Sequence, residues 1–154
     1  MKKQLKLTLL SCLLSIPAIT QAGPKDDIYR KGWIDFNKNG KMDIYEDPSA
    51  PIEERVKDLL SQMNMDEKTC QMATLYGSGR VLADALPTEK WKSEIWKDGI
   101  GNIDEEHNGL GKFGSEYAFP YAKHVKAIHD IQRWFVEETR LGIPVDFTNE
   151  GIRG

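Results

Sequence analysis

A strand, a long helix and a second strand follow one another between residues 99 and 147, and this order constrains the fold more than any other feature. Residues 99–104 predict a short buried strand that opens into a polar loop, and residues 143–147 predict another strand. Residues 121–140 between them predict a helix with one apolar face, and Gly142 suits the left-handed residue that follows a helix. The apolar face is formed by Val125, Ile128, Ile131 or Gln132, and Phe135. This pattern favours a parallel α/β fold, and because two parallel strands need cover on both faces, it predicts the opening portion of a larger sheet.

Two further helices are predicted upstream. The first begins near Pro51 and carries one apolar stripe. The stripe consists of Ile52, Val56, Leu59, Leu60 and Met63. Asn64 can cap the second helix with help from Glu67, and its run through Cys70, Met72 and Leu75 ends at the glycines 77 and 79. Residues 87–97 predict a weaker helical stretch in which Trp91 and Trp96 pack as core, and residues 105–119 predict irregular structure.

The N-terminus has the pattern of a secretory signal peptide. An apolar run over 7–19 follows the basic residues Lys2, Lys3 and Lys6. The short segment 20–22 supplies small residues, and we expect cleavage after Ala22. The product would be secreted or periplasmic, with no membrane span after signal cleavage. An uncleaved anchor or a buried helix is the alternative, and a lipoprotein cut before Cys12 is a weaker one.

The composition narrows the chemistry. Without the signal peptide the chain holds 18 basic and 24 acidic residues, and no basic stripe remains that could neutralise phosphates, so nucleic acid is a poor partner. Cys70 would be the only remaining cysteine, which excludes an internal disulfide and suits a small core residue better than a nucleophile. His107, His124 and His129 have no metal-ligand spacing.

Residues 35–46 match the twelve-residue calcium loop position by position. Glycine occupies the sixth place, where the turn is sharp, and Glu46 occupies the twelfth as the bidentate ligand. The predicted ligands are Asp35, Asn37, Asn39, the carbonyl of Lys41, Asp43 and Glu46. We expect a structural calcium ion that holds the N-terminal segment onto the body. The alternative is a surface turn rich in asparagine and glycine, because no clear helix enters the loop.

Residues 141–154 predict the first wall of a binding site. In parallel α/β folds, ligands bind in the loops at the carboxyl ends of strands, and Glu150 follows the second strand. Its carboxylate can accept two hydrogen bonds from vicinal sugar hydroxyls, and Arg153 can keep it ionised. Taken alone, a capped loop with a surface ion pair fits this pattern better.

Two long segments resemble glycoside hydrolase family 3. Residues 54–72 resemble the opening helices of that family, and residues 131–144 lead into the block 147–154 as they do there. The resemblance covers the chain from about Pro51 to its end and implies the start of a (β/α)8 TIM-type barrel, followed in the whole protein by an α/β sandwich. It implies a retaining exo-β-glycosidase of the β-glucosidase or β-xylosidase type, which needs no catalytic cofactor and acts on oligosaccharides or other β-glycosides.

The resemblance also assigns residues. It implies that Glu150 contacts outer hydroxyls of the terminal sugar, with Arg153 beside it, and that the nucleophile and the acid/base lie beyond residue 154. Many members have aspartate in place of Glu150 and end the block in His-Gly, so the departure here leaves the preferred sugar open.

We therefore predict a signal peptide over 1–22, an N-terminal extension over 23–50 with the calcium-like loop at 35–46, and a truncated barrel domain over 51–154. The chain would be an inactive fragment of the glycosidase. The alternatives are a non-catalytic secreted calcium-binding interaction module and, more weakly, a degraded reading frame.

Overall fold

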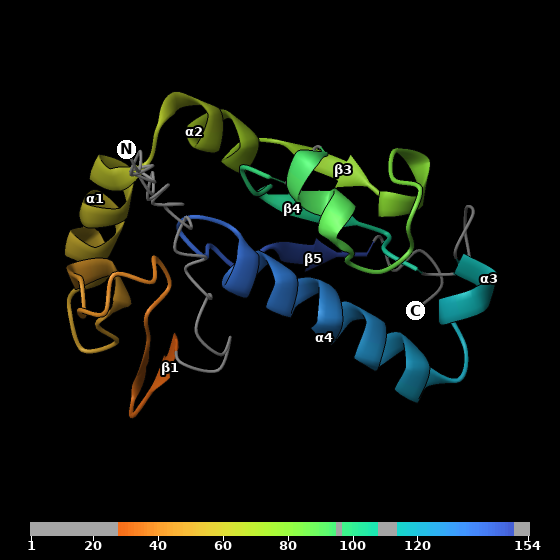
Figure 1. Cartoon of the computed structure of the whole chain (residues 1–154), viewed down its shortest axis with the longest axis horizontal. Helices are drawn as coiled ribbons and strands as arrows, with labels where there is room; N and C mark the ends of the chain where they lie inside the picture. Colours follow the sequence, from red (N-terminus) through yellow and green to blue (C-terminus); the bar gives the residue numbers. More distant parts are fainter. Residues whose placement is uncertain (1–27, 95–96, 108–113, 150–154) are drawn as a thin grey trace, which may run out of the picture.

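The computed structural model describes residues 28–94, 97–107 and 114–149, and Figure 1 shows how their elements are arranged. A hairpin, a loop and α1 lie at one end of the molecule, and α4 runs from the opposite end back along a small sheet (Figure 1). The helices are α1 (Ile52–Gln62), α2 (Met65–Gln71), α3 (Gly114–Tyr117) and α4 (Tyr121–Glu138). The strands are β1 (Tyr29–Arg30), β2 (Trp33–Ile34), β3 (Thr74–Tyr76), β4 (Asn102–Asp104) and β5 (Asp146–Thr148). Short 3-10 helices are η2 (Ile44–Glu46), η3 (Ser78–Arg80) and η4 (Glu89–Ser93).

The main sheet is parallel and has the order β3–β4–β5. Its register aligns Leu75 with Ile103 and Ile103 with Phe147, so the three strands begin at the same level and end at the same level. The parallel pairing of the segments 99–104 and 143–147 is confirmed, although the strands are shorter than predicted. The third strand, β3, lies where the second helix was expected to continue: α2 ends at Gln71, because pairing of residues 74–76 with β4 outweighs the local helical pattern.

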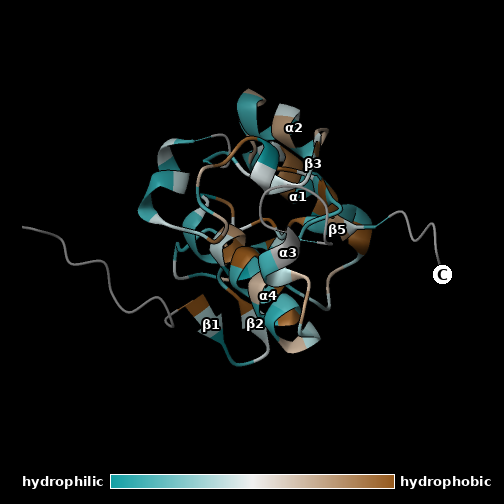
Figure 2. Ribbon diagram, turned by 90° about the vertical axis from the view of Figure 1, so that its right-hand side faces the viewer, coloured by the Kyte–Doolittle hydropathy of each residue, from teal (hydrophilic) through white to brown (hydrophobic). Residues whose placement is uncertain are grey.

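The apolar core lies between the sheet and α4. Ile103 in the central strand, Ile131 and Phe135 on α4, and Trp91 on η4 have no exposed surface. Trp134 contacts the rings of both Trp91 and Phe135 edge to face. Figure 2 shows apolar and polar residues alternating around α4, as expected for a helix that packs one face onto a sheet.

The predicted TIM-type barrel is wrong. The described residues form a two-stranded antiparallel hairpin, β1–β2, and a three-stranded parallel sheet in which β3 and β5 are edges. Three strands cannot curve back to pair β3 with β5, since barrels of this class need eight. The architecture observed is a small α/β unit with a separate hairpin.

Other predicted elements are partly corrected. Of the described residues within 87–97, only those of η4 are helical; Trp91 is core as predicted, and Trp96 lies outside the described residues. Val125, assigned to the apolar face of α4, is 65% exposed, because the buried face is rotated toward Ala127 and Trp134. The amphipathic helix α1 forms as expected, yet it has no buried residue.

Two glycines make the packing at the start of the sheet possible. A Cβ on Gly101 would lie 2.2 Å from the backbone oxygen of Gln71, so the chain before β4 can touch the end of α2 only without a side chain. Gly142 has φ +57°, as predicted for the residue after the helix, and a Cβ there would lie 2.6 Å from the oxygen of Phe36.

Side chains then fix the turn from α4 into β5. The amide of Gln132 donates to the oxygen of Val145 at 2.8 Å and accepts from the nitrogen of Val145 at 2.9 Å, as a neighbouring strand would. Arg140 forms a two-pronged ion pair with the buried carboxylate of Glu67, and it also donates to the oxygen of Gln62 at 2.9 Å. This turn therefore holds α2, α4 and β5 together.

Within the ranges described, no helix is long and apolar enough to cross a membrane. The predicted signal peptide and the predicted sugar-contacting residues Glu150 and Arg153 lie outside the described residues.

Candidate functional site

The carboxyl ends of β3, β4 and β5 form a polar edge. Tyr76, Asp104 and Thr148 are the last residues of these strands and lie in register. The Thr148 hydroxyl donates to Asp104 Oδ1 at 2.8 Å, and Asn102 Nδ2 donates to the same hydroxyl oxygen at 3.2 Å. Since ligands of parallel α/β folds bind at this edge, the side chains here are the first candidates for a site.

A buried carboxylate lies directly beyond β4. Glu106 accepts from the backbone nitrogen of Ser78 at 2.7 Å and from its hydroxyl, while His107 Nε2 lies 3.0 Å from Glu106 Oε1. All three residues are buried. Burial lowers the pKa of His107, and the negative charge of Glu106 acts in the opposite direction. This cluster was not predicted from the sequence, where its signal is a run of ionisable residues, 104–107, at the end of a strand.

The backbone around Glu106 is strained. Glu105 and His107 have φ values of +58° and +52°, in the left-handed region that residues other than glycine seldom adopt. Both are buried, so the surrounding contacts hold the conformation. Strain of this kind costs on the order of 1–3 kcal/mol per residue and gathers at functional sites, which makes this strand end a candidate on grounds independent of its charges.

A hollow of about 330 Å³ opens between α4 and the ends of β4 and β5. Its lining combines Glu106, Thr148 and Asn149 with the apolar side chains of Val125, Ile128 and Phe147. His124 completes it, with Nδ1 buried and without a hydrogen-bond partner. Carboxylate, hydroxyl and amide groups beside an apolar wall can bind a small polyhydroxylated molecule, and Glu150 follows the hollow in sequence.

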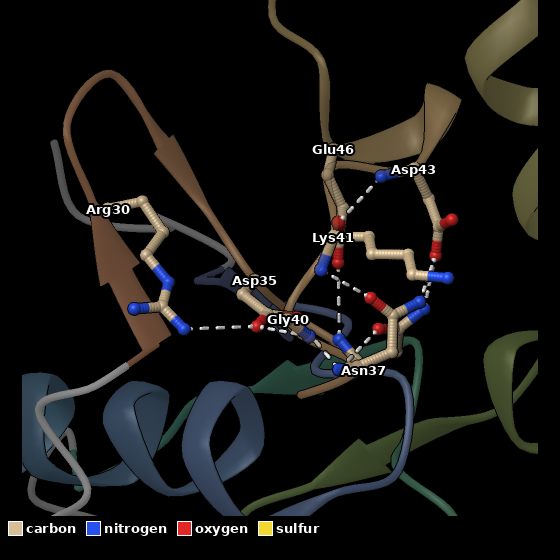
Figure 3. A network of polar contacts seen from close by, with 8 residues as sticks. Arg30, Asp35, Asn37, Gly40, Lys41, Asp43 and Glu46 are labelled. Atoms are coloured by element: carbon tan, nitrogen blue, oxygen red, sulfur yellow. Dashed lines mark hydrogen bonds and ion pairs between the residues drawn. The ribbon is translucent and has the colours of Figure 1, made fainter.

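The predicted calcium loop is the second candidate (Figure 3). The Asp35 side chain accepts from the backbone nitrogens of Asn39 and Gly40 at 3.0 and 2.9 Å, and Arg30 lies 3.7 Å from it. Glu46 accepts from the backbone nitrogens of Asn37 and Asp43 at 3.2 and 3.0 Å. Asp35 and Glu46 are each only 2% exposed, so the first and last positions of the loop hold buried carboxylates.

The middle positions of the loop bind one another. The side-chain nitrogens of Asn37 and Asn39 both donate to Asp43 Oδ2, and the backbone nitrogen of Lys41 donates to Asn39 Oδ1 at 2.7 Å. The predicted ligands thus face one another across the curl of the loop, as Figure 3 shows. In the described part of the chain, no three His, Cys, Asp or Glu side chains converge as a metal-binding group. Any ion here would therefore depend on amide and carbonyl oxygens beside two or three carboxylates.

The geometry defines a class: a small parallel α/β unit with a polar edge at its strand ends. No protein-family model matches the chain. A protein of Formosa agariphila named "Putative beta-xylosidase" is 32% identical over 113 residues, which cover 71% of this chain and 14% of that protein. The chain thus spans about a seventh of the length of the relative that it matches.

Proposed function

We propose that this chain is the amino-terminal portion of a glycosidase, specifically a retaining exo-β-glycosidase of glycoside hydrolase family 3. The observation that carries the proposal is the similarity to a protein named as a β-xylosidase over 71% of the chain. The ordered resemblance of residues 54–72 and 131–154 to family 3 supports the finer assignment. On this proposal the two catalytic carboxylates, which retention requires about 5–5.5 Å apart, lie beyond residue 154.

Glu150 and Arg153 are proposed to bind the terminal sugar. Two features support this role. The two residues follow β5 in the sequence, and β5 ends at the polar edge formed by Asp104 and Thr148. A carboxylate there can accept hydrogen bonds from two neighbouring hydroxyls and would act as a binding group, not as an acid or a nucleophile.

The test begins with the coding sequence after Gly154. A continuing frame with an aspartate in a strand-end loop, whose product releases xylose or glucose from aryl β-glycosides, supports the proposal. In that product Glu150→Ala should lower kcat/KM by about 100-fold, equivalent to the loss of hydrogen bonds to a charged group. Glu53→Gln, on exposed α1, is the matched control and should leave kcat/KM unchanged. A stop codon with no such continuation would exclude a working glycosidase.

We also propose that loop 35–46 binds a structural calcium ion. Support comes from the oxygen-rich spacing of the loop and from its two buried carboxylates, Asp35 and Glu46. Calorimetric titration of calcium should give heat with the wild-type chain and much less with Glu46→Gln. Equal heats of binding in the two proteins would contradict a calcium site in this loop.

The remaining proposals concern export and the alternative function. Cleavage after Ala22 and release to the periplasm or the medium can be checked by N-terminal sequencing of the exported protein. A non-catalytic secreted calcium-binding module is the second candidate, favoured by the buried carboxylates of the loop. It predicts a cooperative thermal transition for residues 23–154 alone, whereas an incomplete glycosidase domain predicts aggregation.

A further inference from the structure

The side chain of Lys38 reaches from loop 35–46 to the end of α4, about a hundred residues later in the sequence. Its Nζ donates to the backbone oxygens of Val136 at 3.0 Å and Thr139 at 2.5 Å, and also to that of Phe36 at 2.7 Å. The last four carbonyl groups of a helix have no partner inside the helix and carry its partial negative charge. A single ammonium group therefore satisfies carbonyls that α4 leaves open.

The sequence of α4 explains why a cation from elsewhere is needed. Its last turn contains no basic residue and ends in Glu137 and Glu138, whose charges oppose the helix dipole. Arg133 and Lys92 pair with these two carboxylates and do not reach the backbone carbonyls through any described contact. Lys38 places the missing positive charge at the helix end.

The backbone of the loop contacts the same region. Lys38 has φ +60°, a conformation that a residue other than glycine adopts only at a free-energy cost. The residue with this strained backbone is the one whose ammonium group contacts α4. The backbone of Phe36 packs against Gly142 so closely that a Cβ there would lie 3.0 Å from Phe36 Cα. Tyr45, near the other end of the loop, donates its hydroxyl to the oxygen of Leu141 at 3.4 Å.

We propose that Lys38 is the C-terminal cap of α4 and couples loop 35–46 to residues 136–145, which form the end of α4 and the turn that leads from it to β5. A ligand that orders the loop then stabilises the turn, and loss of the cap loosens the turn whether or not a ligand is present. Such coupling is reciprocal, so the state of the turn also sets the affinity of the loop for its ligand. Lys38 is a positioning residue in this scheme.

Hydrogen exchange of the complete chain, followed by mass spectrometry of its peptides, tests the coupling without any ligand. Lys38→Met should raise exchange in residues 136–145 about tenfold, the effect of losing hydrogen bonds from a charged donor, while the peptides of β3 and β4 keep wild-type protection. Lys31→Met, on the exposed turn between β1 and β2, should behave as wild type. Unchanged protection of 136–145 in Lys38→Met, or an equal loss in both variants, would overturn the proposal.

Lys38→Gln is a second variant, used in case Lys38→Met does not fold. It keeps one donor but removes the charge, so its exchange in 136–145 should lie between wild type and Lys38→Met. Wild-type protection of 136–145 in folded Lys38→Gln would contradict a cap that depends on the ammonium group.

The second arm adds calcium or a chelator and rests on the proposed calcium site. In the wild type, calcium should protect both 35–46 and 136–145, and in Lys38→Met it should protect 35–46 alone. Protection of the wild-type loop with no change in 136–145 would refute the coupling. No protection anywhere would refute the calcium site, and the ligand-free comparison would then decide the coupling by itself.

Discussion

The two ends of the parallel sheet are built differently. At the amino end, α4, α2 and β5 are held together by contacts of Gly142, Gln132 and Arg140. At the carboxyl end, Asp104 and Thr148 form a polar edge that is partly exposed. Residues 131–144, one of the segments on which the proposed family assignment rests, lead into the first of these ends. Gly142, Gln132 and Arg140 each serve packing or backbone pairing. These three residues therefore build the fold, whereas the residues proposed to contact a sugar, Glu150 and Arg153, follow β5 in the sequence and lie outside the described residues.

The largest effect is expected at Gly142. Gly142→Ala should lower the free energy of unfolding by about 3 kcal/mol, because its Cβ would clash with the backbone oxygens of Phe36 and Val136 at a left-handed φ. Gly40→Ala is the matched control: its φ is +78°, but a Cβ there meets nothing within 4 Å. It should cost only about 1 kcal/mol, and urea unfolding measures both. Equal losses would mean that backbone strain, and not the close packing at this end, sets the stability.

A smaller loss is expected from Arg140→Met. The variant leaves the buried carboxylate of Glu67 without its cation, and since Arg140 itself is half exposed, about 2 kcal/mol is expected. The double variant with Glu67→Gln should recover part of this loss in a mutant cycle measured by urea unfolding. Strict additivity of the two substitutions would show that the ion pair contributes nothing.

Thr148→Val probes the carboxyl end. The substitution removes the hydroxyl that joins Asp104 to Asn102 without changing the volume much, and because the group is exposed, the expected loss is under about 1 kcal/mol. Thermal unfolding followed by circular dichroism would measure it. A loss as large as that of Arg140→Met would remove the contrast between the two ends of the sheet.

The smallest effect concerns pH. Burial lowers the pKa of His107, so below the ordinary histidine value the unfolded chain binds a proton that the folded chain does not. Stability should therefore fall as the pH drops below about 6.5, the unperturbed value, and His107→Gln should flatten this part of the curve. Melting temperatures of both proteins between pH 7.5 and pH 5.5 check the sign, and a wild-type protein that gains stability toward pH 5.5 would contradict it.

The sequence predicted best where one pattern dominated. The stripe in 52–63 and the capping pair Asn64 and Glu67 located α1 and the start of α2, and the strand–helix–strand order gave the parallel pairing of β4 with β5. These features depend on short-range periodicity and capping, which a single sequence records.

Prediction failed where long-range contacts decide the structure. Leu75 fits a helical stripe, but pairing with Ile103 makes it part of β3. Lys38 is not one of the predicted ligands of the calcium-like loop, and only the fold brings its side chain to the end of α4. The barrel was inferred from resemblance, and three strands with two open edges do not form one. Glu150 and Arg153 lie outside the described residues and remain predictions.

The bare surface of α1 has a consequence for how the protein opens. No residue of the helix is fully buried, and two hydrogen bonds help to hold it: the nitrogen of Tyr45 donates to Asp58 Oδ2 at 3.0 Å, and Arg55 Nε donates to the oxygen of Tyr45 at 3.1 Å. An element fastened in this way gains little from the hydrophobic effect and detaches at lower free energy than the core around Ile103. Among the described elements, residues 51–62 should therefore be cleaved first in limited proteolysis, while β4 and α4 are still folded.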